Sequence, residues 1–454
     1  MLTSRAAALW RDRTLRFALG GGAPVVTAVF ALARNKWLAE HLATAGMGVL
    51  GQVFSTQTLL GSAACLGLTL PVARAIGAAT AASDIRAAHR IVWTALALAG
   101  GASLALAVPT LLLAPWLSQA LLGTPDHAVL LRIGTIVVIG LALQTVANGV
   151  FAGRSDVMGP LAVALGGGLV AVAVTVALVP RAGLVGGAIG AAVLLPAGLA
   201  TAWWTRREVR RIVQAFPPRS GFDAGTARAL SRVGLAALAL ALADQGTLLA
   251  LRSHYLRVNG LSANGLLQAA LALSLQASGV FQAYLANYAF GRVSAAAGPE
   301  GVRDYTRRQW APFVSLATLA FAVAMLIAGP LLRILYSDQF APARPLMAWV
   351  LLAEFCRVMT QTWGIGALPA GGLRAWVPIG IAGPLVFIPA YLLLAPVAGV
   401  LALPWASAIS ALIQLVITGV LMGRLGVTLR ARDLALLAAA LAGLGLLARA
   451  VARG

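Results

Sequence analysis

The chain has 454 residues, of which 60% are hydrophobic and only 10% charged, and its formal net charge is +21. About a quarter of the residues of a soluble protein are charged, so this composition excludes a soluble globular fold. The positive charge alone would suggest nucleic acid as a partner, but most arginines lie in short stretches between apolar segments, with no basic run interleaved with aromatic residues. The composition therefore predicts an all-α polytopic membrane protein that binds no nucleic acid.

Twelve apolar segments are long enough to cross a bilayer, because a spanning helix needs about 20 mainly apolar residues. The longest polar stretch between them is 205–232, which contains seven arginines. We therefore predict two six-helix bundles, 1–204 and 233–430, joined by a basic cytoplasmic linker. The segments lie near 17–36, 47–72, 91–115, 130–152, 158–180, 183–204, 233–253, 264–290, 311–335, 345–368, 376–396 and 400–422.

A further apolar segment, 434–448, lies within the C-terminal stretch 431–454. This segment is short for a span, and a crossing would carry Arg449 and Arg453 outward. We therefore expect an interfacial or partly inserted helix here rather than a thirteenth span.

The distribution of basic residues predicts the orientation of the chain. If the N-terminus is cytoplasmic, most arginines fall in the inner connections, whereas the outer connections 116–128 and 396–400 contain no arginine or lysine. Inner connections of membrane proteins are enriched in arginine and lysine. The N-terminus is therefore predicted to lie in the cytoplasm.

The sequence contains an internal repeat with a nearly constant offset of about 217 positions. The stretches DIRAAHRIVW and VRDYTRRQW share the pattern [IV]-R-x-x-x-R-x-x-W, and LLAPWLS at 112–118 matches LLRILYS at 331–337. Since the offset corresponds to six spans, both copies have the same orientation, as in parallel-repeat transporters that work by alternating access. The matched residues include Arg86 with Arg303, Arg90 with Arg307, Trp93 with Trp310, and Gln144-Thr145 with Gln361-Thr362.

Polar side chains inside the apolar segments indicate candidate sites, because such side chains are costly in lipid. Glu354, Arg357 and Gln361 are spaced i, i+3 and i+7 and so share one helix face. Structural roles stay open: the acid–base pair could only tie helices together, basic residues near the segment ends could extend to the headgroups, and the glutamines could link helices. The predicted cavity residues are Arg34, Lys36, Gln52, Gln57, Gln144, Asn148, Asp244, Arg252, Glu354, Arg357 and Gln361.

No pattern typical of an enzyme is present in the sequence: it has no GxSxG, no phosphate-binding loop and no HExxH. We therefore expect neither catalysis nor a cofactor or bound metal. Because no nucleotide-binding module is present, transport is expected to run down a gradient or to be coupled to H⁺ or Na⁺.

Two stretches resemble a known family. LATAGMGVLGQVFSTQTLLGSAACLGLTLPVARAIG at 42–77 and LLRILYSDQFAPARPLMAWVLLAEF at 331–355 are similar to Wzx-type polysaccharide flippases, within the multidrug/oligosaccharidyl-lipid/polysaccharide exporter superfamily. The resemblance implies a location in the bacterial inner membrane and translocation of an undecaprenyl-pyrophosphate-linked oligosaccharide for surface polysaccharides such as O-antigen or exopolysaccharide. Implied partners are this substrate, membrane lipid and polysaccharide assembly proteins. A monomer is expected to suffice, because one chain contains both bundles.

Under this hypothesis the four basic candidate residues bind the pyrophosphate and the amides bind the sugars, while Asp244 and Glu354 tune the cations or carry a coupling proton. An ion-coupled multidrug exporter is the main alternative, although the balance of intramembrane charge is at least as basic as acidic. A lipid II flippase usually has two additional spans, and a membrane-embedded enzyme of glycan assembly should have large outer loops. The identities of the glycan and of the coupling ion stay open.

Overall fold

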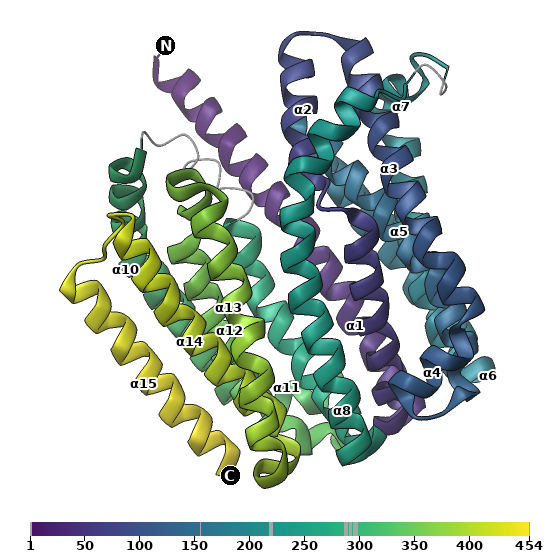
Figure 1. The fold of residues 1–454 in the computed structure, drawn as a ribbon, viewed down its shortest axis with the longest axis vertical. Coiled ribbons are helices and arrows are strands. Elements are labelled where there is room, and N and C mark those ends of the chain that lie inside the picture. Colours follow the sequence, from purple (N-terminus) through teal and green to yellow (C-terminus); the bar gives the residue numbers. More distant parts are fainter. Residues whose placement is uncertain are drawn as a thin grey trace. The chain divides into compact units, whose positions relative to one another are not determined.

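A computed structural model describes residues 2–154, 156–217, 221–285, 289, 293 and 298–453, with side chains from residue 22 onward except at 208, 233, 236 and 237. Every regular element in these ranges is helical, which confirms the predicted all-α class (Figure 1). The basic side chains predicted to precede the first span and part of the end of the segment 264–290 lie outside the described residues.

The chain divides into two compact units. Unit 1 consists of Met1–His41 and Val53–Leu242, and unit 2 consists of Leu42–Gln52 and Ala243–Gly454. The segment Leu42–Gln52 therefore packs with the second half of the chain, although it is flanked on both sides by residues of unit 1. Its small residues are the only hint in the sequence of such close packing, and they do not identify the partner.

Unit 1 is built around α5, which contacts α2, α3 and α6. The 205–232 stretch that the sequence predicts as a linker contains one short helix, α7, and the beginning of α8. The elements before α8 are α1 (Leu2–Cys65), α2 (Thr69–Ala81), α3 (Ile85–Leu112), α4 (Ala114–Leu122), η1 (Pro125–His127), α5 (Ala128–Gly153), α6 (Met158–Thr205) and α7 (Arg207–Gln214).

In unit 2, α12 contacts α10, α14 and α15, and α13 packs along α14 (Figure 1). The first residues of α8 belong to unit 1 and the rest of this helix to unit 2. The elements are α8 (Ala224–Tyr284), α10 (Gly298–Leu326), α11 (Ala328–Leu335), η4 (Asp338–Ala343), α12 (Arg344–Gly364), α13 (Ala367–Ala398), η5 (Gly399–Leu401), α14 (Ala402–Arg424) and α15 (Ala431–Arg453).

The element order confirms the predicted repeat. The succession long helix, short helix, 3₁₀ turn, long helix occurs as α3, α4, η1, α5 and again as α10, α11, η4, α12. The four elements begin at positions 85, 114, 125 and 128 in the first copy and at 298, 328, 338 and 344 in the second. This nearly constant shift agrees with the offset found in the sequence, and it shows that each half of the chain has the same local design.

The breaks in the long helices also occur in equivalent pairs. Gly183 in α6 has φ 51° and ψ −124°, and Gly399, between α13 and α14, has φ 52° and ψ −125°. Ala43 in α1 has φ 52° and ψ −169°, and its counterpart Gly260 in α8 has φ 84° and ψ 173°. Each break separates two pieces, which explains why one long helix holds two of the predicted spans.

Apolar helices account for the predicted segments as far as the structure describes them. Seven helical runs in the described residues are long and apolar enough to cross a membrane, or eight if the bent pair Gly22–Cys65 and Thr69–Ala81 counts as one span. Three of the seven contain one of the breaks described above. The twelve predicted segments fall on these runs, on α11 or on α12.

The C-terminal helix α15 is longer than the apolar segment 434–448 seen in the sequence. It has 23 residues, or roughly 34 Å at 1.5 Å per residue, and it packs along α10 and α12. Its buried residues Leu437, Ala440, Leu444, Ala448 and Val451 recur at helical spacing. The helix is longer than its apolar segment because the flanking residues 431–433 and 449–453 continue it, so its length is sufficient for a span.

The repeated tryptophan of the two basic stretches has the same role in each half. The indole Nε1 of Trp93 on α3 donates to the carbonyl oxygen of Val213 on α7, at 3.0 Å. The indole Nε1 of Trp310 on α10 donates to the carbonyl oxygen of Asp433 on α15, at 3.1 Å. In each half, the tryptophan therefore anchors the helix that follows the bundle.

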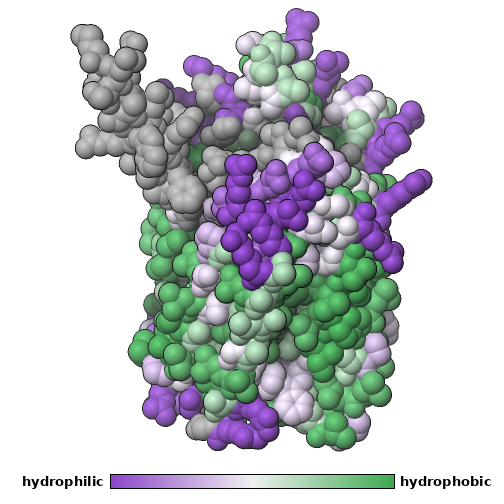
Figure 2. All heavy atoms as spheres, turned by 90° about the vertical axis from the view of Figure 1, so that its left-hand side faces the viewer, coloured by the Kyte–Doolittle hydropathy of each residue, from purple (hydrophilic) through white to green (hydrophobic). Residues whose placement is uncertain are grey.

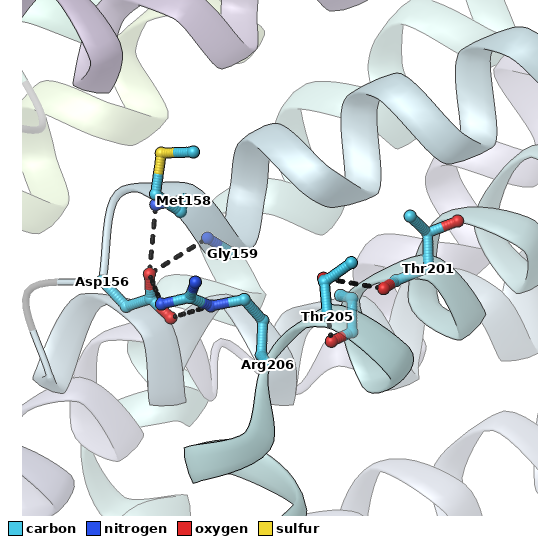
Figure 3. Close-up of polar contacts among 7 residues, drawn as sticks. Asp156, Met158, Gly159, Thr201, Thr205 and Arg206 are labelled. Carbon is cyan, nitrogen blue, oxygen red and sulfur yellow. Dashed lines mark hydrogen bonds and ion pairs between the residues drawn. The ribbon is translucent and has the colours of Figure 1, made fainter.

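A salt bridge joins the two ends of α6. Arg206, at the C-terminal end, donates from Nε and Nη2 to the two carboxylate oxygens of Asp156, at 2.8 and 2.7 Å (Figure 3). One of these oxygens also accepts from the backbone nitrogens of Met158 and Gly159, at 3.1 Å each, and so caps the first turn. Because α6 turns back at Gly183, this pair fixes it as a helical hairpin.

Candidate functional site

The predicted cavity residues are divided between the two units. Gln52, Asp244, Arg252, Glu354, Arg357 and Gln361 belong to unit 2, and Arg34, Lys36, Gln57, Gln144 and Asn148 belong to unit 1.

An ion pair on α12 forms the centre of the polar residues in unit 2. Arg357 Nη1 donates to Glu354 Oε1 at 2.5 Å, and Arg357 Nη2 donates to the hydroxyl of Ser407 on α14 at 3.0 Å. The Glu354 side chain is 1% exposed, whereas the Arg357 side chain is 30% exposed. The spacing i, i+3 predicted this pair. The sequence does not identify Ser407 as the partner of Arg357 on α14, because it is one of many small residues in that helix.

One further acid, Asp244, belongs to this acidic–basic cluster. The carboxylate of Asp244 on α8 also acts electrostatically on the Arg357 guanidinium. Asp244 is exposed and accepts a hydrogen bond from Gln245 Nε2 at 3.1 Å. Within the described residues, Glu354 Oε2 is buried and has no hydrogen-bond partner. This carboxylate oxygen is therefore a buried acceptor that the described protein groups leave open.

Arg252 lies deeper in unit 2, and protein groups surround it. It is 2% exposed. Its Nη2 donates to the side-chain oxygen of Asn264 at 3.2 Å, and its Nη1 donates to the carbonyl oxygen of Gly51 at 3.4 Å. The structure therefore places this guanidinium between the second piece of α8 and the segment Leu42–Gln52.

The segment Leu42–Gln52 makes several further polar contacts in this region. Gln52 Nε2 donates to the Ser253 hydroxyl at 2.6 Å, and Asn264 Nδ2 donates to the carbonyl oxygen of Gly48 at 2.8 Å. Ser253 donates in turn to the carbonyl oxygen of Leu249 at 2.9 Å. Sequence reasoning selected Gln52 and Arg252 but missed Asn264 and Ser253, although both are polar and lie in an apolar helix.

The segment and α8 approach each other closely at two glycines. A Cβ atom on Gly48 would collide with the carbonyl oxygen of Leu261, and a Cβ atom on Gly265 would collide with the carbonyl oxygen of Thr44. The two glycines are separated by the offset of the repeat, and so are Thr44 and Leu261, so equivalent positions of the two repeats contact each other reciprocally. Close backbone contact of this kind requires small residues and is typical of helix crossings in membranes.

The amide residues of the predicted site lie in different settings. Gln361 on α12 is exposed, so it can contact a ligand. Gln144 and Asn148 on α5 are partly buried and lie one turn apart on the same helix. Gln57 is 4% exposed and packs against Gly134 of α5, where a Cβ atom would meet its Nε2 at 2.6 Å. The setting of Gln57 is that of a residue that links helices.

The basic pair in unit 1 lies near the end of the first piece of α1. The Arg34 guanidinium stacks over the Phe54 ring, 5.5 Å from its centroid. Lys36 Nζ lies 3.7 Å from Glu40 Oε1, and both side chains are exposed. An exposed ion pair of this type contributes little to stability. In unit 2, Arg357 is fixed by two side-chain partners and is partly accessible.

The chain has no match among protein-family models, and no curated protein matches its sequence. Solved structures do match. An inward-facing multidrug resistance MATE family transporter of the MOP superfamily is 16% identical, with a TM-score of 0.70, and the match covers 90% of this chain and 95% of that one. An outward-facing MATE family transporter of the MOP superfamily is also 16% identical, with a TM-score of 0.64 and coverage of 93% and 95%. The lipid II flippase MurJ, in an inward closed conformation, is 11% identical, with a TM-score of 0.70 and coverage of 95% and 92%.

These similarities extend over nearly the whole chain and show its fold. Together with the apolar helices, they show an all-α, multi-pass membrane protein with the architecture of these transporters and flippases. At identities of 11% to 16%, the similarity assigns no role to any single residue.

Proposed function

We propose that the chain moves an undecaprenyl-pyrophosphate-linked oligosaccharide across the bacterial inner membrane by alternating access, with its N-terminus in the cytoplasm. The fold supports a flippase or exporter in general, and the two stretches that resemble Wzx-type flippases favour this substrate. The observation that carries the proposal is Arg357, a partly exposed guanidinium in an apolar helix that Glu354 and Ser407 hold in place. An oriented guanidinium can bind a phosphate through two hydrogen bonds.

The Glu354–Arg357 pair also suggests how transport is coupled to protons. While Glu354 is ionised, it neutralises the guanidinium and weakens its attraction for phosphate. When Glu354 is protonated, the guanidinium loses this internal partner, and its charge becomes available to the substrate. We propose that proton binding and substrate binding at this pair are coupled in this way, with Gln361 positioned to contact the sugar on the same helix.

Transport can be measured with the full chain in proteoliposomes that contain a fluorescent undecaprenyl-pyrophosphate-linked oligosaccharide. We expect Arg357→Ala to reduce the initial rate by about tenfold or more, because a hydrogen bond to a charged group contributes about 1.5–3 kcal/mol. Arg357→Lys should retain part of the rate. Glu354→Gln, which mimics the protonated acid, should bind the substrate more tightly than wild-type protein with Glu354 ionised, and transport should lose its pH dependence.

Arg333→Ala is the matched control, because Arg333 on α11 is 66% exposed and pairs only weakly with Asp338, at 3.6 Å. Equal loss in both arginine variants would contradict a specific role for Arg357. In a host that lacks the gene, wild-type protein should restore surface polysaccharide and Arg357→Ala should not.

A cation-coupled multidrug exporter is the second candidate. The observation that favours it is that two acids, Glu354 and Asp244, both act on the charge of Arg357. The same proteoliposomes distinguish the two functions: uptake of an organic cation driven by a pH gradient, without movement of the lipid-linked oligosaccharide, would replace the flippase proposal.

A further inference from the structure

A groove of about 480 Å³ lies in unit 2 where α10 meets the start of α15. The residues that line it come from two parts of the sequence more than 100 positions apart. Its charged members are Asp304, Arg307, Arg308, Arg430, Arg432 and Asp433, so arginines outnumber acids by four to two.

Both acids and one of the arginines already interact with protein groups. Asp433 is 2% exposed, and its Oδ2 accepts from the backbone nitrogen of Arg430 at 3.2 Å, which caps α15. Asp304 lies 3.7 Å from Arg303, a residue that does not line the groove. Arg307 Nε donates to the carbonyl oxygen of Thr428 at 2.7 Å, which fixes the chain that leads into α15.

The guanidinium groups of Arg308 and Arg430 are exposed, and within the described residues neither makes an ion pair or a side-chain hydrogen bond. Arg432 lies 3.8 Å from Asp433 but is 73% exposed. The groove therefore presents a surplus of positive charge on a frame that hydrogen bonds hold in place. A phosphate is the anion that such a cluster of arginines binds best, because each guanidinium can donate two hydrogen bonds.

The groove continues directly into an apolar stripe on α10. Arg308 and Pro312 line the groove, and Leu316, Leu319 and Leu326 follow them at intervals of three, four or seven residues, so all five lie on one helix face. The three leucines are 60%, 63% and 60% exposed. Figure 2 shows a hydrophobic band on the face that carries α10 and α15, with hydrophilic side chains above it. An anion that enters this groove can therefore carry acyl chains that lie along the stripe.

From these observations we propose that the groove binds an anionic phospholipid, with the phosphodiester at Arg308 and Arg430 and the acyl chains along the exposed leucines of α10. A free phosphate would use the arginines but not the stripe. The corresponding place in unit 1 lacks this combination. There the repeat offset of 217 positions places Ile91 and Val213 at the positions of Arg308 and Arg430, so the arginine pair is absent.

The test is hydrogen–deuterium exchange of the full chain in nanodiscs, read at residues 428–436. With phosphatidylglycerol instead of phosphatidylcholine, we expect exchange there to slow by roughly tenfold in the wild type, since arginines near an anionic lipid surface are attracted to it. Arg308→Gln/Arg430→Gln should abolish the difference. Arg308→Lys/Arg430→Lys should keep most of it, which also shows that side-chain replacement at these positions leaves the fold intact.

Arg207→Gln/Arg228→Gln is the matched control, because it removes two exposed arginines from the basic stretch 205–232 and should leave the protection unchanged. Protection by phosphatidylglycerol that persists in Arg308→Gln/Arg430→Gln would overturn the proposal. Equal loss in the control would do the same, because it would show a general charge effect. Inorganic phosphate, added to phosphatidylcholine nanodiscs at millimolar concentration, should give no protection; if it protected as well as phosphatidylglycerol, the groove would be a phosphate site and not a lipid site.

Discussion

Gly48 and Gly265 occupy equivalent positions of the repeat and face each other in unit 2. Each approaches a carbonyl oxygen on the other helix: Gly48 that of Leu261, and Gly265 that of Thr44. The side chain of Asn264 closes the crossing with a hydrogen bond of 2.8 Å to the carbonyl oxygen of Gly48. The buried Arg252 reaches the same crossing through Asn264 and Gly51.

This reciprocity predicts that a methyl group at either glycine is equally harmful. We expect Gly48→Ala and Gly265→Ala each to lower the free energy of unfolding by about 1–3 kcal/mol, because the backbones must separate. Thermal unfolding in detergent measures the effect. Gly279→Ala on α8 is the control: a Cβ atom there meets nothing within 4 Å, so it should be neutral or stabilising. A Gly265→Ala variant as stable as Gly279→Ala would contradict the close crossing.

The break at Ala43 and its counterpart at Gly260 predict that substitutions at the two positions change stability in opposite directions. Ala43 has φ 52° and ψ −169°, a backbone conformation that is nearly restricted to glycine, whereas its counterpart Gly260 has φ 84°. Ala43→Gly should therefore stabilise the protein by about 1 kcal/mol, since relief of strain exceeds the entropy cost of glycine. Gly260→Ala should destabilise it by about 1–2 kcal/mol. The midpoint of thermal unfolding should move in opposite directions for the two variants, and a shift in the same direction would show that the breaks are not equivalent.

The repeated tryptophans predict matching local effects. Trp93→Phe and Trp310→Phe each remove one indole donor from a carbonyl oxygen, on α7 and α15 respectively. The expected cost is about 1 kcal/mol each. Hydrogen–deuterium exchange should accelerate at 207–214 in the first variant and at 431–437 in the second. Trp204→Phe is the control, because Trp204 is 74% exposed and should change neither region.

The hydrogen bonds of Asp223 predict that the stability of the first turn of α8 depends on pH. A hydrogen bond with the Thr226 side chain, then the hydrogen bond of 2.6 Å from the Thr226 backbone nitrogen to Oδ2, hold the pKa of the Asp223 carboxyl below its ordinary value of 3.8, with a smaller contribution from Arg90. Because the folded pKa is lowered, the stabilisation is complete above pH 3.8 and is lost as the pH falls from 3.8 through the folded pKa. Exchange at residues 224–228 should therefore accelerate in this acidic range.

In Asp223→Asn the same residues should exchange at a rate independent of pH between 5 and 3 (after correction for intrinsic exchange), because the amide does not titrate. An identical acid-induced acceleration in this variant would place the titrating group elsewhere.

Much of the fold could be predicted from the sequence because lipid imposes it. An apolar segment of about 20 residues must satisfy its own backbone hydrogen bonds in a bilayer, so composition alone indicates helices. The repeat was visible because matched local features, such as the arginines and tryptophan of DIRAAHRIVW, stay at a constant offset. The pair Glu354–Arg357 was predicted for the same reason: two residues at i, i+3 on one helix must lie close together.

The placement of Leu42–Gln52 was decided only by the tertiary structure. Its neighbours in the sequence belong to unit 1, whereas its partners on α8 lie in the other half of the chain. The same holds for Ser407 beside Arg357, for the depth of Arg252, and for α15, whose packing on α10 and α12 sets its placement. A helix pattern states which face is apolar or polar, because that property is local. Which helix covers that face depends on backbone approach and side-chain shape over long sequence distances, and only the folded chain brings those atoms together.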